Sequence, residues 1–231
     1  MQKIDTAFVL GAGLGTRLRP LTENTPKPML KIGGRPLIEI IFDKLLAAGV
    51  RKIIVNTHHA SGVYAEYFKG DSYRGAKLQF IHEPTLLDTG GALKNALPIL
   101  DEHRGVLVYN GDILSDVNIS AFLEKFALSN EPASLVLRDC GSNKNVSVKG
   151  DWVCDMRFAL GASFDKTAQF TGIFAARGEF FELLKSKSEA IFSSVDIFLS
   201  LIKSSPCSIS AHFDNSAWND IGSIEVYEKL R

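Results

Sequence analysis

The sequence predicts an α/β protein: a three-layer α/β/α sandwich around a mixed, mostly parallel sheet. Short apolar segments of strand length alternate with amphipathic segments of helical length through the first half of the 231 residues. Lys52–Thr57 is apolar at the successive positions Ile53, Ile54 and Val55, as in a strand that is buried on both faces. Strands separated by helices need right-handed crossovers, which make the neighbouring strands parallel.

The first half of the chain supplies the regular part of this fold. Pro36–Ala48 has apolar residues at helical spacing, with Pro36 in its first turn and Gly49 as its stop. The other segments follow the same two periodicities. The predicted strands are Thr6–Leu10, Lys52–Thr57, Leu78–His82, Val106–Asn110 and Ser134–Arg138, and the predicted helices are Pro36–Ala48, Gly62–Phe68, Gly91–Leu100 and Ile119–Leu128.

The second half is less regular, and we expect it to form a small, partly antiparallel region for the substrate. Gly150-Asp151 separates two strand-like segments and predicts a hairpin. We expect a single domain over residues 1–231, with a core of about residues 1–135. The predicted elements of this half are the strands Asn145–Lys149, Trp152–Arg157, Phe170–Ala176 and Ser208–Phe213 and the helices Glu179–Leu184, Ser194–Ile202 and Ile224–Leu230.

Composition excludes several classes of partner. Lys and Arg number 26, as do Asp and Glu, so no basic excess points to nucleic acid or to an anionic membrane surface. No apolar run approaches the ~20 residues that cross a bilayer, and the first residues lack a secretory signal, so we expect a cytoplasmic protein. Cys140, Cys154 and Cys207 lack CxxC spacing, which predicts buried free thiols instead of a disulfide or a zinc site.

A glycine-rich loop, Gly11–Gly15, follows the first predicted strand. Ligands bind at the carboxyl ends of strands in open α/β sheets, and glycines there let backbone N–H groups approach phosphate oxygens. The dinucleotide pattern GxGxxG fails at Thr16, and the pattern GxxxxGK[ST] fails at Thr16 and Arg17. The loop is therefore either an unusual phosphate site or a tight turn.

Basic residues follow the loop closely. Arg17 and Arg19 come within one turn of it, and Lys27 is held between Pro26 and Pro28, which restrict its backbone. Such a group of cations suits a triphosphate, whose charge must be offset before an anionic nucleophile can approach. The alternative for the two arginines is a solvated surface pair.

Two acids are candidate metal ligands. Asp112 follows the predicted strand Val106–Asn110 and Gly111, so it points into the crevice where ligands bind. Asp220 lies in Trp218–Gly222, near the end of the sequence. Mg²⁺ takes one or two carboxylates together with substrate phosphates and water. The alternatives are a turn at Asp112 and a helix cap at Asp220.

The run Leu10–Thr22, followed by Pro26-Lys27-Pro28, resembles the signature of the sugar-1-phosphate nucleotidyltransferases. The resemblance implies their Rossmann-like, glycosyltransferase-A-like fold, with Arg17 and Lys27 as catalytic residues and with Asp112 and Asp220 as Mg²⁺ ligands. It also implies a sugar-binding part over about residues 136–231. The implied nucleotide contacts are Leu10, Gly11, Ala12, Gly13, Gly15, Thr16, Thr89, Gly90 and Gly91, and the implied sugar contacts are Asn110, Thr171 and Gly172.

The resemblance leaves the base and the sugar open. Thr89-Gly90-Gly91 lies in the segment that helps select the base in the family, and its form is similar to the N-acetylmuramate-1-phosphate uridylyltransferases and to the mannose- and heptose-1-phosphate guanylyltransferases. We favour UTP with N-acetylmuramate 1-phosphate over GTP with mannose or heptose 1-phosphate. Many relatives have Glu-Lys-Pro where this chain has Met156-Arg157-Phe158, so the sugar contacts depart from the family pattern.

The expected reaction, as the resemblance implies, is attack of the sugar phosphate on the α-phosphorus with loss of pyrophosphate, by a monomer or a homodimer. A catalytically silent nucleotide-binding regulator is the alternative of another class. Such a protein often lacks a metal carboxylate or the catalytic arginine, and here Arg17, Lys27, Asp112 and Asp220 are all present. A dinucleotide-dependent oxidoreductase is disfavoured by Thr16 and by the absence of an acid after the second long strand.

Overall fold

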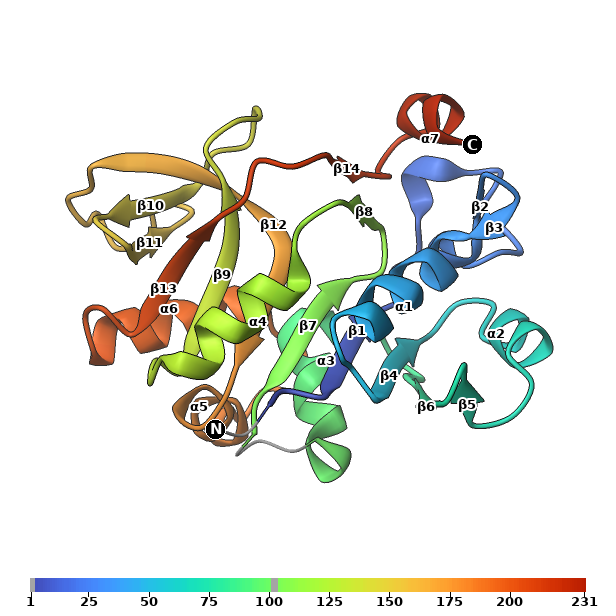
Figure 1. The fold of residues 1–231 in the computed structure, drawn as a ribbon, viewed down its shortest axis with the longest axis horizontal. Coiled ribbons are helices and arrows are strands. Elements are labelled where there is room, and N and C mark those ends of the chain that lie inside the picture. Colours follow the sequence, from blue (N-terminus) through green and yellow to red (C-terminus); the bar gives the residue numbers. More distant parts are fainter. Residues whose placement is uncertain (1–2, 101–103) are drawn as a thin grey trace.

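The computed structural model describes residues 3–100 and 104–231 and has a ten-stranded mixed sheet with helices on both faces (Figure 1). The strand order is β10-β11-β13-β9-β12-β7-β1-β4-β6-β5. The predicted α/β class is therefore confirmed. The strands of this sheet are β1 (Thr6–Leu10), β4 (Lys52–Thr57), β5 (Ser72–Tyr73), β6 (Ala76–His82), β7 (Val106–Asn110), β9 (Ala133–Arg138), β10 (Val146–Lys149), β11 (Trp152–Met156), β12 (Lys166–Ala176) and β13 (Ile209–Phe213).

Helices cover each face of the sheet and bury a separate apolar cluster there. α1 and α4 pack on one face with residues such as Phe42 and Phe122, and α3, α5 and α6 pack on the other with residues such as Leu93 and Phe198 (Figure 1). This gives the three predicted layers. The α-helices are α1 (Leu37–Ala47), α2 (Gly62–Tyr67), α3 (Asp88–Ala96), α4 (Ile119–Leu128), α5 (Glu179–Ser186), α6 (Ser194–Ser204) and α7 (Ile224–Leu230).

The strands β7-β1-β4-β6 are parallel, and their carboxyl ends lie along one edge of the sheet. β9 and β13 form a second parallel pair. The second-half strands extend the same sheet, and apart from the β9–β13 pair they are antiparallel to their neighbours. β12 joins them because it runs antiparallel to both β7 and β9, and its first residues pair with β10. This pairing also makes β12 begin at Lys166, four residues before the predicted start at Phe170.

Two short ribbons were not expected from the sequence. β2 (Lys31–Ile32) pairs with β3 (Arg35–Pro36), and β8 (Ile113–Ser115) pairs with β14 (Trp218–Asp220). The predicted hairpin at Gly150 is confirmed.

The cysteines are free, as predicted, but their predicted burial is wrong: Cys140 and Cys154 are half-buried and Cys207 is exposed. Within residues 3–100 and 104–231, no helix has the length and apolar character needed to span a bilayer.

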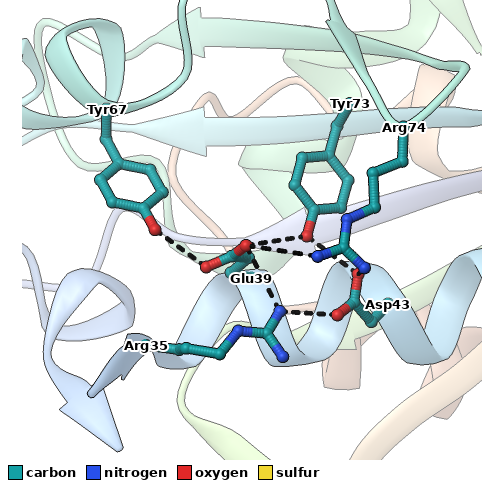
Figure 2. A network of polar contacts seen from close by, with 6 residues as sticks. All are labelled: Arg35, Glu39, Asp43, Tyr67, Tyr73 and Arg74. Carbon is teal, nitrogen blue, oxygen red and sulfur yellow. Dashed lines mark hydrogen bonds and ion pairs between the residues drawn. The ribbon is translucent and has the colours of Figure 1, made fainter.

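A polar network fastens the β5–β6 hairpin to α1 (Figure 2). Glu39 accepts hydrogen bonds from the hydroxyls of Tyr67 (2.9 Å) and Tyr73 (3.1 Å). Asp43 forms ion pairs with Arg35 (2.6 Å) and Arg74 (3.0 Å). Arg74 has a φ of 46° in the turn between the two strands, a left-handed conformation that a non-glycine side chain rarely adopts. The two ion pairs of Arg74 with α1 stabilise this turn.

This network predicts that stability depends on pH. Burial raises the pKa of Glu39, but hydrogen bonds from Tyr67, Arg35 and Tyr73 outweigh it and hold the pKa below its ordinary value of 4.5. A carboxyl with a lowered folded-state pKa stabilises the fold above its unfolded-state pKa, and that contribution is lost as the pH falls through the folded-state value. Glu39→Gln should therefore lower the free energy of unfolding near neutral pH, and the difference from the wild type should shrink below about pH 4.5.

Urea unfolding at a series of pH values checks this expectation. Glu66→Gln is the matched control, because Glu66 lies exposed on the neighbouring α2 and no contact of its side chain is found among the described residues. An equal deficit of Glu39→Gln at neutral and acid pH would contradict the role assigned to the carboxylate.

Candidate functional site

Two adjoining cavities lie at the carboxyl ends of the parallel strands. The larger, about 410 Å³, is lined by residues that follow β1, β4, β6 and β7, and the smaller, about 330 Å³, by the glycine-rich loop and Lys27. Gly13, Leu86 and Asp112 line both. Of the predicted nucleotide contacts, all within the described part of the chain, Leu10, Ala12, Gly13 and Thr89 line the larger cavity, Gly13, Gly15 and Thr16 line the smaller, and Gly11, Gly90 and Gly91 line neither.

The glycines of the loop have different reasons to be glycine. A Cβ on Gly11 would lie 2.9 Å from the carbonyl oxygen of Asn56, and its N–H donates to Asn56 Oδ1 at 2.8 Å. Gly11 therefore packs the loop against β4. Gly15 has a φ of 61° and accepts a hydrogen bond from the hydroxyl of Thr22 (2.8 Å). At Gly13 a Cβ would meet no atom within 4 Å, so this exposed glycine is the one with open space on the cavity side.

Lys27 lies between two carboxylates from distant parts of the chain. It begins the 3₁₀ turn η2 (Lys27–Met29) and is only 7% exposed. Its Nζ lies 2.6 Å from Asp112 Oδ2 and 3.6 Å from Asp220 Oδ1. The β8–β14 ribbon brings the two acids together, because Asp220 pairs with Ile113 and the N–H of Ile221 donates to the Asp112 carbonyl (3.0 Å).

The two acids have the character of cation ligands. Asp220 Oδ1 is buried and accepts no hydrogen bond, and the side chain of Asp112 is 32% exposed at the cavities. Lys27 Nζ, at 3.6 Å, is too far to donate a hydrogen bond to Asp220 Oδ1, and a buried carboxylate oxygen without a hydrogen bond costs free energy, which a closer cation would offset. Among the described residues no group of three or more His, Cys, Asp or Glu side chains converges on a point. Two carboxylates still fit Mg²⁺, since this ion takes its other ligands from phosphates and water.

Arg17 reaches the same place from η1 (Thr16–Leu18). A Cβ on Gly222 would lie 3.1 Å from Arg17 Nη2 and 3.2 Å from Asp220 Oδ1, so the guanidinium rests against the backbone beside Asp220. Arg17 lines the smaller cavity, and within the described residues its guanidinium has no ion-pair or hydrogen-bond partner. Arg19, two residues later, is exposed and does not line this cavity. The structure therefore separates the two arginines that the sequence treated together.

The predicted sugar contacts fall in different environments. Asn110 lines the larger cavity. Gly172 has a φ of 80°, and a Cβ there would lie 2.5 Å from Asn110 Nδ2, so this glycine makes room for the Asn110 side chain. Thr171 is fully buried, and its hydroxyl donates to the carbonyl of Val136 (2.8 Å). Its side chain is thus engaged inside the sheet, which leaves Asn110 as the predicted sugar contact at the cavity.

Thr89, Gly90 and Gly91 lie in the first turn of α3, which begins at Asp88 and thus before the predicted start at Gly91. The N–H groups of Gly90 and Gly91 both donate to the carbonyl of Phe192 (2.9 and 3.1 Å). A Cβ on Gly91 would lie 2.1 Å from the carbonyl oxygen of Ala190. The glycine pair therefore allows the segment before α6 to pack on α3.

Gly91→Ala is accordingly expected to destabilise the protein. The added methyl group overlaps a backbone carbonyl, and overpacking of this kind costs about 1–3 kcal/mol, which lowers the melting temperature of a chain of this size by roughly 2–12 °C. Thermal unfolding checks this, with Gly13→Ala as the control at open space. Weakened nucleotide binding by Gly91→Ala at an unchanged melting temperature would instead favour a direct ligand contact.

Glu83 is a site residue that the sequence analysis missed. It is 1% exposed, lines the larger cavity, and accepts hydrogen bonds from Asn56 Nδ2 (2.9 Å) and the N–H of Leu87 (3.3 Å). Its position in the sequence could have identified it, because Glu83 directly follows the parallel strand β6. The dinucleotide pattern places its acid after the second long strand, where this chain has Asn56-Thr57, whereas Glu83 follows the next strand, β6. Ile191 also lines this cavity, and nothing local in the sequence marks a residue that arrives from the second half.

Comparison with known proteins gives a consistent family. The family described as Nucleotidyl transferase matches residues 6–146. The mannose-1-phosphate guanylyltransferase of Mycobacterium tuberculosis is 28% identical over 227 residues, which cover 96% of this chain and 62% of that protein. The N-acetylmuramate alpha-1-phosphate uridylyltransferase of Neisseria meningitidis serogroup B is 41% identical over 117 residues, 50% of each chain.

Solved structures agree on the fold. A UDP-glucose pyrophosphorylase from Acinetobacter baumannii superposes with a TM-score of 0.79 at 19% identity, over 98% of this chain and 92% of that one. The matches to the two curated relatives above, by contrast, span only between half and about six-tenths of those proteins' length.

Proposed function

Because the chain belongs to the Nucleotidyl transferase family, we propose that it transfers a nucleotidyl group from a nucleoside triphosphate to a sugar 1-phosphate, releasing pyrophosphate. The main support for this proposal is that Lys27, Asp112 and Asp220 lie together beside the glycine-rich loop. The nucleophile of such a reaction is an ionised phosphate, so the site needs no general base. It needs cations that offset the charge of two anionic substrates.

Each residue of this group has a role that its position supports. Asp112 and Asp220 would hold Mg²⁺, which would supply positive charge that offsets the charge of the reacting phosphates. Arg17, whose guanidinium lines the smaller cavity, would stabilise charge on the departing pyrophosphate. Lys27 would orient the two carboxylates and contact phosphate oxygens. The backbone at Gly13 would allow the triphosphate to approach.

The larger cavity would hold the base and the sugar. UTP with N-acetylmuramate 1-phosphate remains the favoured pair, supported by the 41% identity to a uridylyltransferase over half of the chain. The alternative base, guanine, is supported by the 28% identity to a mannose-1-phosphate guanylyltransferase over 96% of this chain. GTP with mannose or heptose 1-phosphate is therefore the second candidate.

Pyrophosphate release with Mg²⁺ tests the proposal, across UTP, GTP, CTP, ATP and dTTP and a panel of muramate, mannose, heptose and glucose 1-phosphates. Release with one clear pair is the expected result and identifies both substrates. Nucleotide binding without release for any sugar 1-phosphate would contradict the proposal and favour a catalytically silent regulator.

A further inference from the structure

A third cavity, of about 130 Å³, lies beside the candidate site on the second-half strands. Two chain segments, one in β12 and one at the start of α6, link this cavity to the larger cavity. Phe170 lines it and precedes Gly172, which contacts Asn110, by two residues of β12, or about 7 Å. Val195 also lines it and follows Ser194, whose Oγ lies 3.1 Å from Oγ1 of Thr89 in the larger cavity. A sugar bound at Asn110 could therefore extend a substituent into this cavity.

The polar groups of the third cavity are unpaired. Arg157 and Asn143, both exposed, and the half-buried Asn145 line it, and within the described part of the chain none of their side chains has a hydrogen-bond or ion-pair partner in the protein. Asp155, two residues before Arg157 in the sequence, does not neutralise it. It is 1% exposed, and its carboxylate accepts hydrogen bonds from the N–H groups of Leu160 (3.0 and 3.1 Å) and Ala162 (3.4 Å). The cavity thus presents a guanidinium and two amides with free donors.

The backbone around Arg157 is strained. Arg157 and Phe158 have φ values of 58° and 57°, a left-handed conformation that side chains with a Cβ rarely adopt, and two such residues in a row are unusual. The N–H of Arg157 donates to the carbonyl of Asn145 at 2.6 Å, which holds this conformation and keeps Arg157 beside Asn145. Strain of this kind persists where the surroundings impose it, and it gathers at binding sites.

We propose that this third cavity binds a carboxylate on the sugar 1-phosphate, so that the preferred acceptor is an acidic sugar. The inference rests on the proposed function. A guanidinium fork binds a carboxylate through two parallel N–H···O bonds, and amide N–H donors complete its coordination. With a volume of about 130 Å³, the cavity has room for a carboxylate on a short carbon arm.

The test compares N-acetylmuramate 1-phosphate with N-acetylglucosamine 1-phosphate, which differ only in the lactyl ether that carries the carboxylate. kcat/KM for pyrophosphate release is measured for each with the preferred nucleotide, and glucuronate 1-phosphate tests a carboxylate at another position. We expect the wild type to prefer an acidic sugar. Arg157→Gln should reduce the ratio of acidic to neutral kcat/KM by roughly 10- to 100-fold, the scale of one charge-assisted hydrogen-bonded pair.

Three further variants test whether the effect of Arg157→Gln is specific to the charge in the third cavity. Arg157→Lys should keep part of the preference, and Asn145→Asp should lower it further by placing a negative charge in the cavity. Arg51→Gln, which removes an equal charge beside the amino end of β4, should leave the ratio unchanged. An equal or higher kcat/KM for the neutral sugar in the wild type, or a ratio unaffected by Arg157→Gln, would overturn this inference alone. The absence of pyrophosphate release with every sugar 1-phosphate would overturn the proposed function and the inference with it.

Discussion

Asp112→Asn is expected to lower kcat by roughly 10³-fold or more while the protein stays folded. The substitution keeps the shape of the side chain but removes the charge that faces Lys27 and the proposed Mg²⁺. A metal ion that polarises a phosphoryl oxygen contributes several kcal/mol to the stabilisation of the transition state, and each ~1.4 kcal/mol is a factor of ten in rate. Because the side chain is about one-third exposed and Lys27 keeps Asp220 as a second carboxylate partner (3.6 Å), the melting temperature should change by no more than about 4 °C.

Asp116→Asn is the matched control for this variant. Asp116 lies four residues later, is largely exposed and pairs with Lys44 (2.7 Å), outside both cavities of the candidate site. It should turn over like the wild type. A large fall in the melting temperature of Asp112→Asn with activity retained would mean that Asp112 serves the fold, and the metal assignment would be wrong.

Arg17→Ala is expected to lower kcat by roughly 10²–10³-fold, the usual effect of removing one preorganised electrostatic donor. The effect should fall on kcat more than on KM, since charge on the departing pyrophosphate develops in the transition state. The structure supports this expectation because the guanidinium lines the smaller cavity beside Asp220 and Lys27. Single-turnover kinetics measures the chemical step directly.

Arg19→Ala is an unusually close control for Arg17→Ala, since it removes the same side chain two residues away. Arg19 is exposed and outside the smaller cavity, so its loss should leave kcat unchanged. Equal effects of the two substitutions would indicate a general contribution of surface charge and would contradict the specific role of Arg17.

Much of the fold could be predicted because its signals are local. β1, β4, β7, α4 and α7 have the predicted boundaries, each set by apolar periodicity and neighbouring glycine or polar residues. The second half differs because its pairing is between distant segments. The first residues of β12 form a strand only because β10 lies beside them, and the β8–β14 ribbon joins segments that are each too short to be recognised alone.

For the candidate site too, the residues could be named from the sequence, but their arrangement depends on contacts between distant segments. The family resemblance named Lys27, Asp112 and Asp220, and the structure brings all three together. The resemblance could not show that Lys27 lies between the two acids, since that depends on the turn η2 and on the β8–β14 ribbon. Gly90 and Gly91 were interpreted as ligand contacts because their packing partners, Ala190 and Phe192, lie about a hundred residues away along the chain.

Nucleotidyl transfer is tested most directly by following which product receives each phosphate of the nucleoside triphosphate. With Mg²⁺, a sugar 1-phosphate and a nucleoside triphosphate labelled at the α- or the γ-phosphate, we expect all of the α label in the nucleotide sugar. All of the γ label should be in pyrophosphate, in equal amount and only when the sugar 1-phosphate is present. Release of γ label as inorganic phosphate, or of α label as free nucleoside monophosphate without regard to the sugar, would show hydrolysis and contradict nucleotidyl transfer.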